Sequence, residues 1–187
     1  WVWLDKDGDG IQDAGEAGIN GVTVNLRNAA TNALIATTVT GAGSDDPATP
    51  GDESQGYYQF TGLTPGAGYK VEFVNPDAVG PDAYVFSPRQ VGANPAIDSD
   101  AAVSDPVTLA SGEFNRTLDA GLYRPGSIHV FGFLDKDGDG KLDIDEGAFP
   151  DDPGKTIQLI KDGVVISTKT TVNGVVGWEG LAPGTYT

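Results

Sequence analysis

The chain has 187 residues, 27 of them acidic and 11 basic, which gives a formal net charge of −16 and a pI near 4.1. This charge argues against nucleic acid as a partner, because phosphate backbones are bound through Lys and Arg. No window approaches the roughly 18 consecutive apolar residues that a membrane-spanning helix needs. The absence of Cys excludes disulfides, a thiol nucleophile and Cys-ligated zinc.

Several segments alternate between apolar and polar residues, as half-buried β-strands do. In chain order, we expect strands at residues 1–4, 22–27, 69–73 and 157–160. Asp162-Gly163, between Ile160 and Val164, predicts a tight hairpin turn. No segment carries a sustained helical stripe, so the fold class is predicted to be all-β, with tandem Ig-like antiparallel β-sandwiches.

An internal repeat defines the domain organisation. The heptapeptide LDKDGDG occurs at residues 4–10 and again at 134–140, and FTGLTPGAGY (60–69) is matched by WEGLAPGTY (178–186). We therefore expect one domain at residues 1–124 and a second, incomplete copy at 125–187. The first copy has no counterpart of residues 126–130 ahead of Trp1, which suggests a window on a longer tandem array.

The strongest chemical signal lies inside the repeated block. Two segments fit the twelve-residue calcium-loop pattern D-x-D-x-D-G-x5-E without a mismatch. The first supplies Asp5, Asp7, Asp9, Asp13, Glu16 and the backbone carbonyl of Ile11; the second supplies Asp135, Asp137, Asp139, Asp143, Glu146 and the carbonyl of Lys141. Calcium takes about six to eight oxygen ligands, and alternate carboxylates on a tightly turning backbone converge on one point. Ca²⁺ is thus the predicted cofactor.

The negative charge of these loops also favours the binding of a cation. Residues 5–16 hold five acids and one Lys, and residues 135–146 hold six acids and two Lys, so each loop carries −4. One divalent ion would halve that charge. The alternative is a solvated Asp/Gly loop of Asx-turns that holds no ion. Because strands and not helices flank the loops, their expected role is structural.

The sequence also resembles a known family. VWLDKDGDGIQDAGEAGINGVTVNL, YYQFTGLTPG and the LDAGLY ending at residues 118–123 resemble the calcium-binding B-repeats (SdrD B-like, prealbumin-like) of bacterial serine-aspartate-repeat surface adhesins. The resemblance covers residues 1–124, and residues 126–187 look like half of a more divergent copy. It implies an extracellular, calcium-rigidified stalk at a bacterial surface, whose partners are neighbouring repeats of the same chain. If the second copy ends where this sequence ends, its unpaired strands could be covered by other subunits of a filament through strand addition.

The resemblance further implies additional calcium ions in acidic loops. The candidates are Asp98 and Asp100, with Asp45, Asp46, Asp52 and Asp105 as weaker ones; an ordinary solvated acidic loop is the alternative for all of them. The stretch 41–56, rich in Gly, Pro and acidic residues, is expected to be a surface loop. The second copy is three residues longer between the loop Glu and the next strand.

Two other classes of function, an enzyme and a carbohydrate-binding module, compete with the structural role. An enzyme is not expected, because the regularly spaced carboxylates are accounted for by metal ligation and the single His, His129, sits in an alternating strand-like run. A carbohydrate-binding accessory module remains as the alternative, since aromatic residues can stack on sugars. The candidate aromatic residues are Trp1, Trp3, Tyr57, Tyr58 and Trp178.

Overall fold

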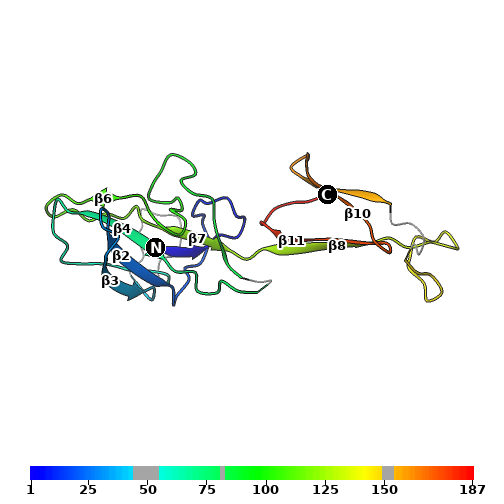
Figure 1. Cartoon of the computed structure of the whole chain (residues 1–187), viewed down its shortest axis with the longest axis horizontal. Coiled ribbons are helices and arrows are strands. Elements are labelled where there is room, and N and C mark those ends of the chain that lie inside the picture. The colour runs from blue at the N-terminus through cyan, green and yellow to red at the C-terminus, as the bar shows by residue number, and fades with distance from the viewer. Residues whose placement is uncertain (44–54, 81–82, 149–153) are drawn as a thin grey trace. The chain divides into compact units, whose positions relative to one another are not determined.

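A computed structural model describes residues 1–43, 55–80, 83–148 and 154–187. The described residues form strands and no helix, which confirms the all-β prediction (Figure 1). They divide into two compact units, Trp1–Arg124 (unit 1) and Pro125–Thr187 (unit 2). The expected loop at residues 41–56 lies largely outside the described residues.

Unit 1 consists of two sheets. Its strands are β1 (Val2–Leu4), β2 (Thr23–Asn28), β3 (Leu34–Val39), β4 (Gly68–Phe73), β5 (Val85–Phe86), β6 (Val107–Thr108) and β7 (Ala120–Tyr123). One sheet has the order β3-β2-β4-β6 and is antiparallel throughout. The other has the order β1-β7-β5, in which β1 pairs with β7 in parallel and β5 with β7 antiparallel.

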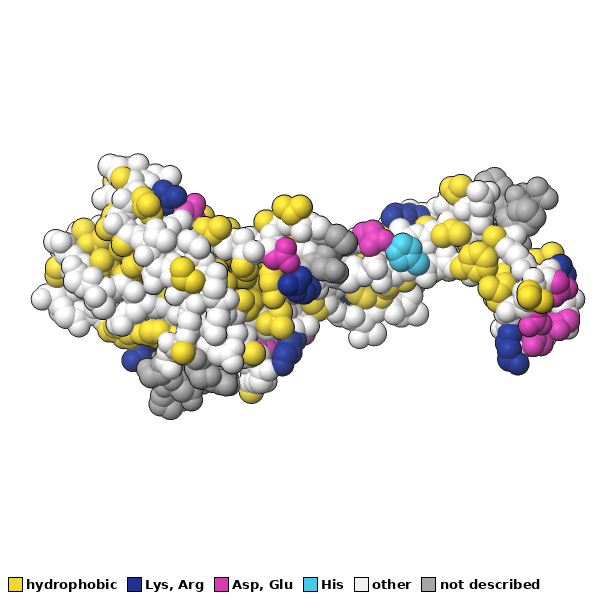
Figure 2. Space-filling model, turned by 90° about the horizontal axis from the view of Figure 1, so that it is seen from below, with side chains coloured by type: hydrophobic (Ala, Val, Ile, Leu, Met, Phe, Trp, Pro, Cys, Tyr) yellow, Lys and Arg dark blue, Asp and Glu magenta, His cyan; other side chains and the backbone are white. Residues whose placement is uncertain are grey.

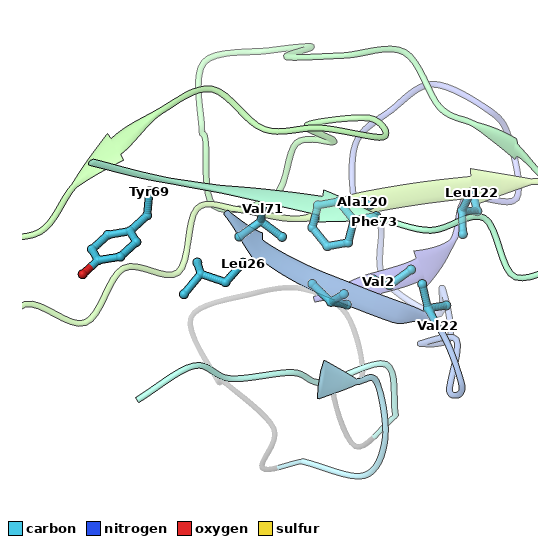
Figure 3. Packing of buried hydrophobic residues seen from close by; sticks show 9 residues of the cluster. Val2, Val22, Leu26, Tyr69, Val71, Phe73, Ala120 and Leu122 are labelled. Atoms are coloured by element: carbon cyan, nitrogen blue, oxygen red, sulfur yellow. The ribbon is translucent and has the colours of Figure 1, made fainter. Parts of the chain in front are cut away.

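The core of unit 1 lies between these sheets. Alternate residues of β2 and β4 point inward, because successive side chains of a strand face opposite sides. They meet the inward residues of β1 and β7, and the resulting cluster is drawn as sticks in Figure 3. Its members are Val2, Val22, Val24, Leu26, Tyr69, Val71, Phe73, Ala120 and Leu122. Contributions from both sheets to one core make unit 1 a β-sandwich.

Unit 2 is built from two antiparallel pairs. Its strands are β8 (Gly126–Phe131), β9 (Thr156–Lys161), β10 (Val164–Thr170) and β11 (Val175–Leu181). β8 pairs with β11 and β9 with β10. A small core of Leu159, Val176 and Trp178 joins the two pairs.

The β9–β10 hairpin is closed by the predicted turn. Asp162 and Gly163 both adopt positive φ, 51° and 77°, as the two central residues of a type I′ turn must. This turn twists in the same sense as the strands, so a two-residue connection suffices.

Candidate metal centre

The first acidic loop, residues 5–16 (loop 1), begins where β1 ends. The backbone nitrogen of Asp5 donates to the carbonyl of Leu122 in β7 at 2.9 Å, and the nitrogen of Leu4 donates to the carbonyl of Ala17 at 2.8 Å. The two ends of the loop are thus held side by side at the edge of the sandwich. A short, closed loop of this kind must turn sharply, and Gly8 and Gly10 make the turn with φ of 73° and 85°.

Asp5 organises the first half of loop 1. Its side chain is buried, and its two carboxylate oxygens accept the backbone N–H groups of Gly8 at 2.6 Å and Gly10 at 2.9 Å. Asp7 and Asp9 are exposed and accept the N–H groups of Asp9 and Ile11. These Asx-type bonds wind the backbone around the carboxylates.

Glu16 closes the loop from the other side. Its side chain is buried, Oε1 accepts the N–H of Lys6 at 2.7 Å, and Oε2 accepts the N–H of Asp13 at 3.0 Å. Burial raises the pKa of Glu16, and the two N–H donors oppose that rise. Partial desolvation by the loop also raises the pKa of Asp7, and the charge of Asp9 adds to the effect.

The carboxylates of loop 1 converge. Asp5, Asp7 and Glu16 each offer an oxygen, and these oxygens lie within 4.8 Å of one another; the same holds for Asp7, Asp9 and Asp13. The loop's own lysine does not neutralise this cluster, since Lys6 Nζ donates to the carbonyl of Gly15. Among the described residues, no ion pair involves an acidic side chain of loop 1.

Residues 135–146 (loop 2) repeat this network in unit 2. Asp135 accepts N–H groups from Gly138 at 2.6 Å and Gly140 at 2.9 Å, and Glu146 accepts them from Lys136 at 2.5 Å and Asp143 at 3.1 Å. Each of these bonds has its counterpart 130 residues earlier.

Loop 2 also repeats the convergence of carboxylate oxygens and the hydrogen bond that closes loop 1. Oxygens of Asp135, Asp137 and Glu146, and of Asp137, Asp139 and Asp143, again lie within 4.8 Å. The nitrogen of Leu134 donates to the carbonyl of Gly147 at 3.1 Å, as Leu4 does to Ala17 in unit 1.

The two loops differ in their surroundings. Asp5 and Glu16 are buried, whereas Asp135 and Glu146 are half-buried. In loop 2 the N–H groups of Gly140 and Gly138 lower the pKa of Asp135. Loop 1 therefore keeps its charges against a larger desolvation cost than loop 2.

The deeper burial of loop 1 is explained by the segment around Ser99, which pairs with it. The nitrogen of Gln12 donates to the carbonyl of Ile97 at 2.7 Å, and the nitrogen of Ser99 donates to the carbonyl of Gly10 at 3.0 Å. Ile11 and Asp98 between them form a non-hydrogen-bonded antiparallel pair. The N–H and C=O of Ile11 thus point away from this segment, and the N–H reaches Asp9 Oδ1 at 2.7 Å. The carbonyl oxygen of Ile11 points to the same side of the backbone as its N–H group.

The weaker candidates lie apart from these clusters. Asp98 and Asp100 are buried but belong to none of the carboxylate groups found among the described residues. Asp100 accepts the N–H of Asp119 at 3.0 Å, and burial raises its pKa to about 6. Asp105 is engaged by Arg89 at 2.6 Å. Asp45, Asp46 and Asp52 lie outside the described residues.

Sequence reasoning missed the contribution of this neighbouring segment. The sequence predicts Asp98 and Asp100 of the DSD stretch as further ligands, whereas in the structure the backbone of this stretch covers loop 1 and Ser99 Oγ accepts the N–H of Gly121. In the structure this role is marked by the backbone hydrogen bonds between the two segments and by the burial of Ser99 and Gln12, both polar. Their spacing in the sequence carries no signal for it.

The Trp side chains that are candidates for stacking on sugars are largely buried. Trp1, Trp3 and Trp178 are 8%, 0% and 5% exposed. Trp1 stacks on Trp3 with ring centroids 5.7 Å apart, and Trp178 belongs to the core of unit 2. The rings of Trp3 and Trp178 are therefore buried in the protein, whereas Trp1, Tyr57 and Tyr58 line a groove of unit 1.

His129 occupies an ordinary strand position. It lies on β8 with 60% of its side chain exposed, coloured cyan in Figure 2, and its Nε2 is 2.6 Å from Glu179 Oε1 on β11. The described residues include no helix with the length and apolar character needed to cross a lipid bilayer.

Comparison with known proteins shows a match to one protein family. The profile of the SdrD B-like domain matches residues 1–122. Serine-aspartate repeat-containing protein D of Staphylococcus aureus (strain Newman) is 32% identical over 190 residues, covering 100% of this chain and 13% of the relative. Protein C of the same strain is 34% identical over 188 residues, covering 100% of this chain and 18% of the relative. The chain thus spans less than a fifth of the length of these relatives.

Proposed function

Because this chain belongs to the family of SdrD B-like domains, we propose that it is a calcium-stabilised stalk or spacer segment of a bacterial surface protein. The family consists of structural repeat domains of surface adhesins and is not an enzyme family. It places the chain outside the cell, at the bacterial surface. The calcium ions and the mechanical role are the parts that we propose.

The observation that carries the proposal is the repetition of one carboxylate network in two separate units. Loop 1 and loop 2 share their glycine positions, their hydrogen bonds and their groups of converging oxygens. Loops that were merely solvated acidic turns would have no reason to keep five acidic side chains at the same spacing 130 residues apart. A shared ligand supplies that reason.

The donor set fits a calcium ion. Hard cations of this size take carboxylate and carbonyl oxygens, and a bidentate glutamate at position twelve is typical of such loops. The ligands would be Asp5, Asp7, Asp9, Asp13, Glu16 and the carbonyl of Ile11, and their counterparts in loop 2. A bound ion would supply the positive charge that the described surroundings of loop 1 lack.

Stabilisation follows from linkage. An ion that binds the folded loop and not the unfolded chain stabilises the fold by RT ln(1 + [Ca²⁺]/Kd), about 3 kcal/mol at a hundredfold excess over Kd. Loop 1 gains more from the ion than loop 2, because its acidic side chains are more deeply buried.

We assign the two units to successive repeats of one array, the second present here as part of a repeat. The partners of the segment are then neighbouring repeats of the same chain, with other subunits of a filament as further partners. Asp98 and Asp100 are secondary metal candidates in this assignment.

Thermal unfolding tests the proposal. In 2 mM calcium we expect the melting temperature of unit 1 to rise by on the order of 10 °C over that in excess chelator, since about 3 kcal/mol shifts a domain of this size by that amount. The D5N/D7N variant should lose this shift for unit 1 and keep it for unit 2, and D135N/D137N the reverse. Asp162→Asn, in the β9–β10 turn and outside both loops, serves as the control for neutralising a carboxylate elsewhere in the chain. Equal melting temperatures of the unmodified chain with calcium and with chelator would refute the proposal.

A further inference from the structure

The chain contains two Asn-Gly dipeptides in nearly the same local sequence, INGV at residues 19–22 and VNGV at residues 172–175. This dipeptide is chemically labile, because glycine has no Cβ that would keep its backbone nitrogen away from the side chain of the preceding asparagine. The nitrogen can attack the side-chain amide carbon and displace ammonia. How fast this happens in a folded protein depends on how firmly the surroundings hold the two reacting groups.

The surroundings of Asn20-Gly21 hold both groups. The nitrogen of Gly21 donates to the carbonyl of Thr40 at 2.8 Å. The side-chain oxygen of Asn20 accepts the N–H of Gly56, also at 2.8 Å. The next residue, Val22, is fully buried in the core of unit 1. A reaction at Asn20 therefore has to break two hydrogen bonds, one at each reacting group, beside a packed core.

Asn173-Gly174 is the turn between β10 and β11. Both residues adopt positive φ, 50° and 74°, as the two central residues of a type I′ turn do. The flanking residues Val172 and Val175 exchange both of their backbone hydrogen bonds, each at 3.0 Å. Asn173 is exposed, and so are Val172 and Val175, at 66% and 43%. The turn is thus an exposed tip that one residue pair closes.

The reacting groups of this turn are not held by hydrogen bonds. Among the described residues, neither the nitrogen of Gly174 nor the side-chain amide of Asn173 has a hydrogen-bond partner. Gly174 is buried and its carbonyl accepts the N–H of Gly132 at 2.8 Å, so this bond fixes the carbonyl and leaves the nitrogen unbonded. Opening the tip costs little free energy, because few apolar contacts support it.

From this contrast we propose that Asn173 is a site of spontaneous deamidation. The nitrogen of Gly174 forms a bond to Cγ of Asn173, and the bond from Cγ to the side-chain nitrogen breaks. That nitrogen leaves as ammonia, taking the proton of the Gly174 N–H, and a succinimide ring remains. Water then adds to one of the two ring carbonyl carbons and opens the ring to isoaspartate or to aspartate. Either product carries a new carboxylate, and water is the only co-reactant.

The two products affect the turn differently. Aspartate leaves the main chain unchanged, and Asp tolerates positive φ as Asn does. Isoaspartate routes the main chain through the former side chain and so lengthens it by one methylene group. A two-residue turn of type I′ geometry cannot absorb this group, so the bonds between Val172 and Val175 are lost. Isoaspartate therefore loosens the start of β11, the strand that carries Val176 and Trp178 of the core of unit 2.

Comparison of the two dipeptides within one protein tests the site. The folded chain is incubated with calcium at mildly alkaline pH, and the deamidated fraction at each asparagine is followed by peptide mapping with mass spectrometry. We expect Asn173 to react at least about tenfold faster than Asn20, because the reaction at Asn20 must first break two hydrogen bonds. In guanidinium chloride the two sites should react at similar rates. Equal rates in the folded chain, or the same ratio in guanidinium chloride, would overturn the proposal.

A second measurement tests the effect on the turn. The isoaspartate form is separated from the incubated chain by chromatography, and Asn173→Asp supplies the aspartate product as the control for the added charge. We expect amide exchange at Val172 and Val175 to be about tenfold faster in the isoaspartate form than in the fresh chain, and unchanged in Asn173→Asp. Equal exchange in all three proteins would contradict the proposed opening of the turn.

Discussion

Gly10 and Gly140 occupy the same position of the two acidic loops, with φ of 85° and 79°, but their surroundings differ. A Cβ at Gly10 would lie 2.4 Å from the carbonyl oxygen of Pro88, whereas one at Gly140 would meet no atom of the described residues within 4 Å. The glycine of loop 1 is thus required for two reasons, its backbone conformation and the close approach of Pro88. The glycine of loop 2 is required for the first reason alone.

This difference predicts unequal costs for the same substitution. Gly140→Ala should destabilise unit 2 by about 1 to 2 kcal/mol, the cost of an L-residue in the left-handed region. Gly10→Ala should destabilise unit 1 by about 1 to 3 kcal/mol more, because the backbone at Pro88 must move. Urea unfolding in chelator measures both values without a contribution from calcium. Equal losses would show that the approach of Pro88 is relieved without cost.

At the scale of the strands, β2 and β4 are joined on their outer face by a polar cluster. Glu72 on β4 accepts hydrogen bonds from Asn25 at 2.9 Å and from the Arg27 guanidinium at 2.7 and 2.9 Å. The hydrogen bond from Asn25, followed by that from Arg27, lowers the pKa of Glu72. This cluster ties two strands whose inner faces form the core.

The lowered pKa predicts how this cluster responds to acid. A carboxyl group whose folded-state pKa lies below its unfolded value contributes stability above the unfolded pKa of about 4.5, and that contribution is lost as pH falls through the folded pKa. Glu72→Gln should therefore cost at most about 1 kcal/mol at pH 7, as expected for a partly exposed pair. The cost should shrink toward zero as the pH falls from the unfolded pKa through the lowered folded-state pKa of Glu72. A double-mutant cycle with Arg27→Gln isolates the pair, and a coupling that grows on acidification would contradict this assignment.

Patterns within a few consecutive residues, such as polar–apolar alternation or a turn dipeptide, predicted individual strands and turns. The alternation at residues 22–27 and 69–73 corresponds to β2 and β4, and the Asp162-Gly163 turn was predicted by its dipeptide. The parallel pairing of β1 with β7 was not predicted, since it joins residues more than a hundred positions apart. The same holds for the contact of Gly10 and Gln12 with the Ile97–Ser99 segment. Hydrophobic periodicity does not indicate contacts between segments that lie far apart in the sequence. The deeper burial of loop 1 could therefore not be derived from the sequence.

At the scale of the whole molecule, the position of loop 2 relates calcium to the junction of the two units. Asp135 comes ten residues after Pro125, and β8 alone separates the loop from the junction. We propose that an ion that orders loop 2, which follows the end of β8 away from Pro125, also orders this strand and so restricts the motion of one unit relative to the other.

Small-angle scattering of the chain tests this restriction. With calcium we expect a narrower distribution of molecular dimensions than with chelator at the same ionic strength. The D135N/D137N variant should keep the broad distribution under both conditions, while D5N/D7N should still narrow. Distributions of the unmodified chain that do not change with calcium would remove loop 2 from any role at the junction.

The parallel pairing of β1 with β7 has a mechanical consequence. A pulling force that enters unit 1 at Trp1 and leaves at Arg124 draws these two strands in opposite directions along their common axis. The hydrogen bonds between Val2–Leu4 and Ala120–Leu122 are then loaded together in shear, because they lie across the line of force. An antiparallel pair loaded at one end would instead open one bond at a time, like a zipper. Unit 1 therefore places its first and last strands in the arrangement that resists extension best.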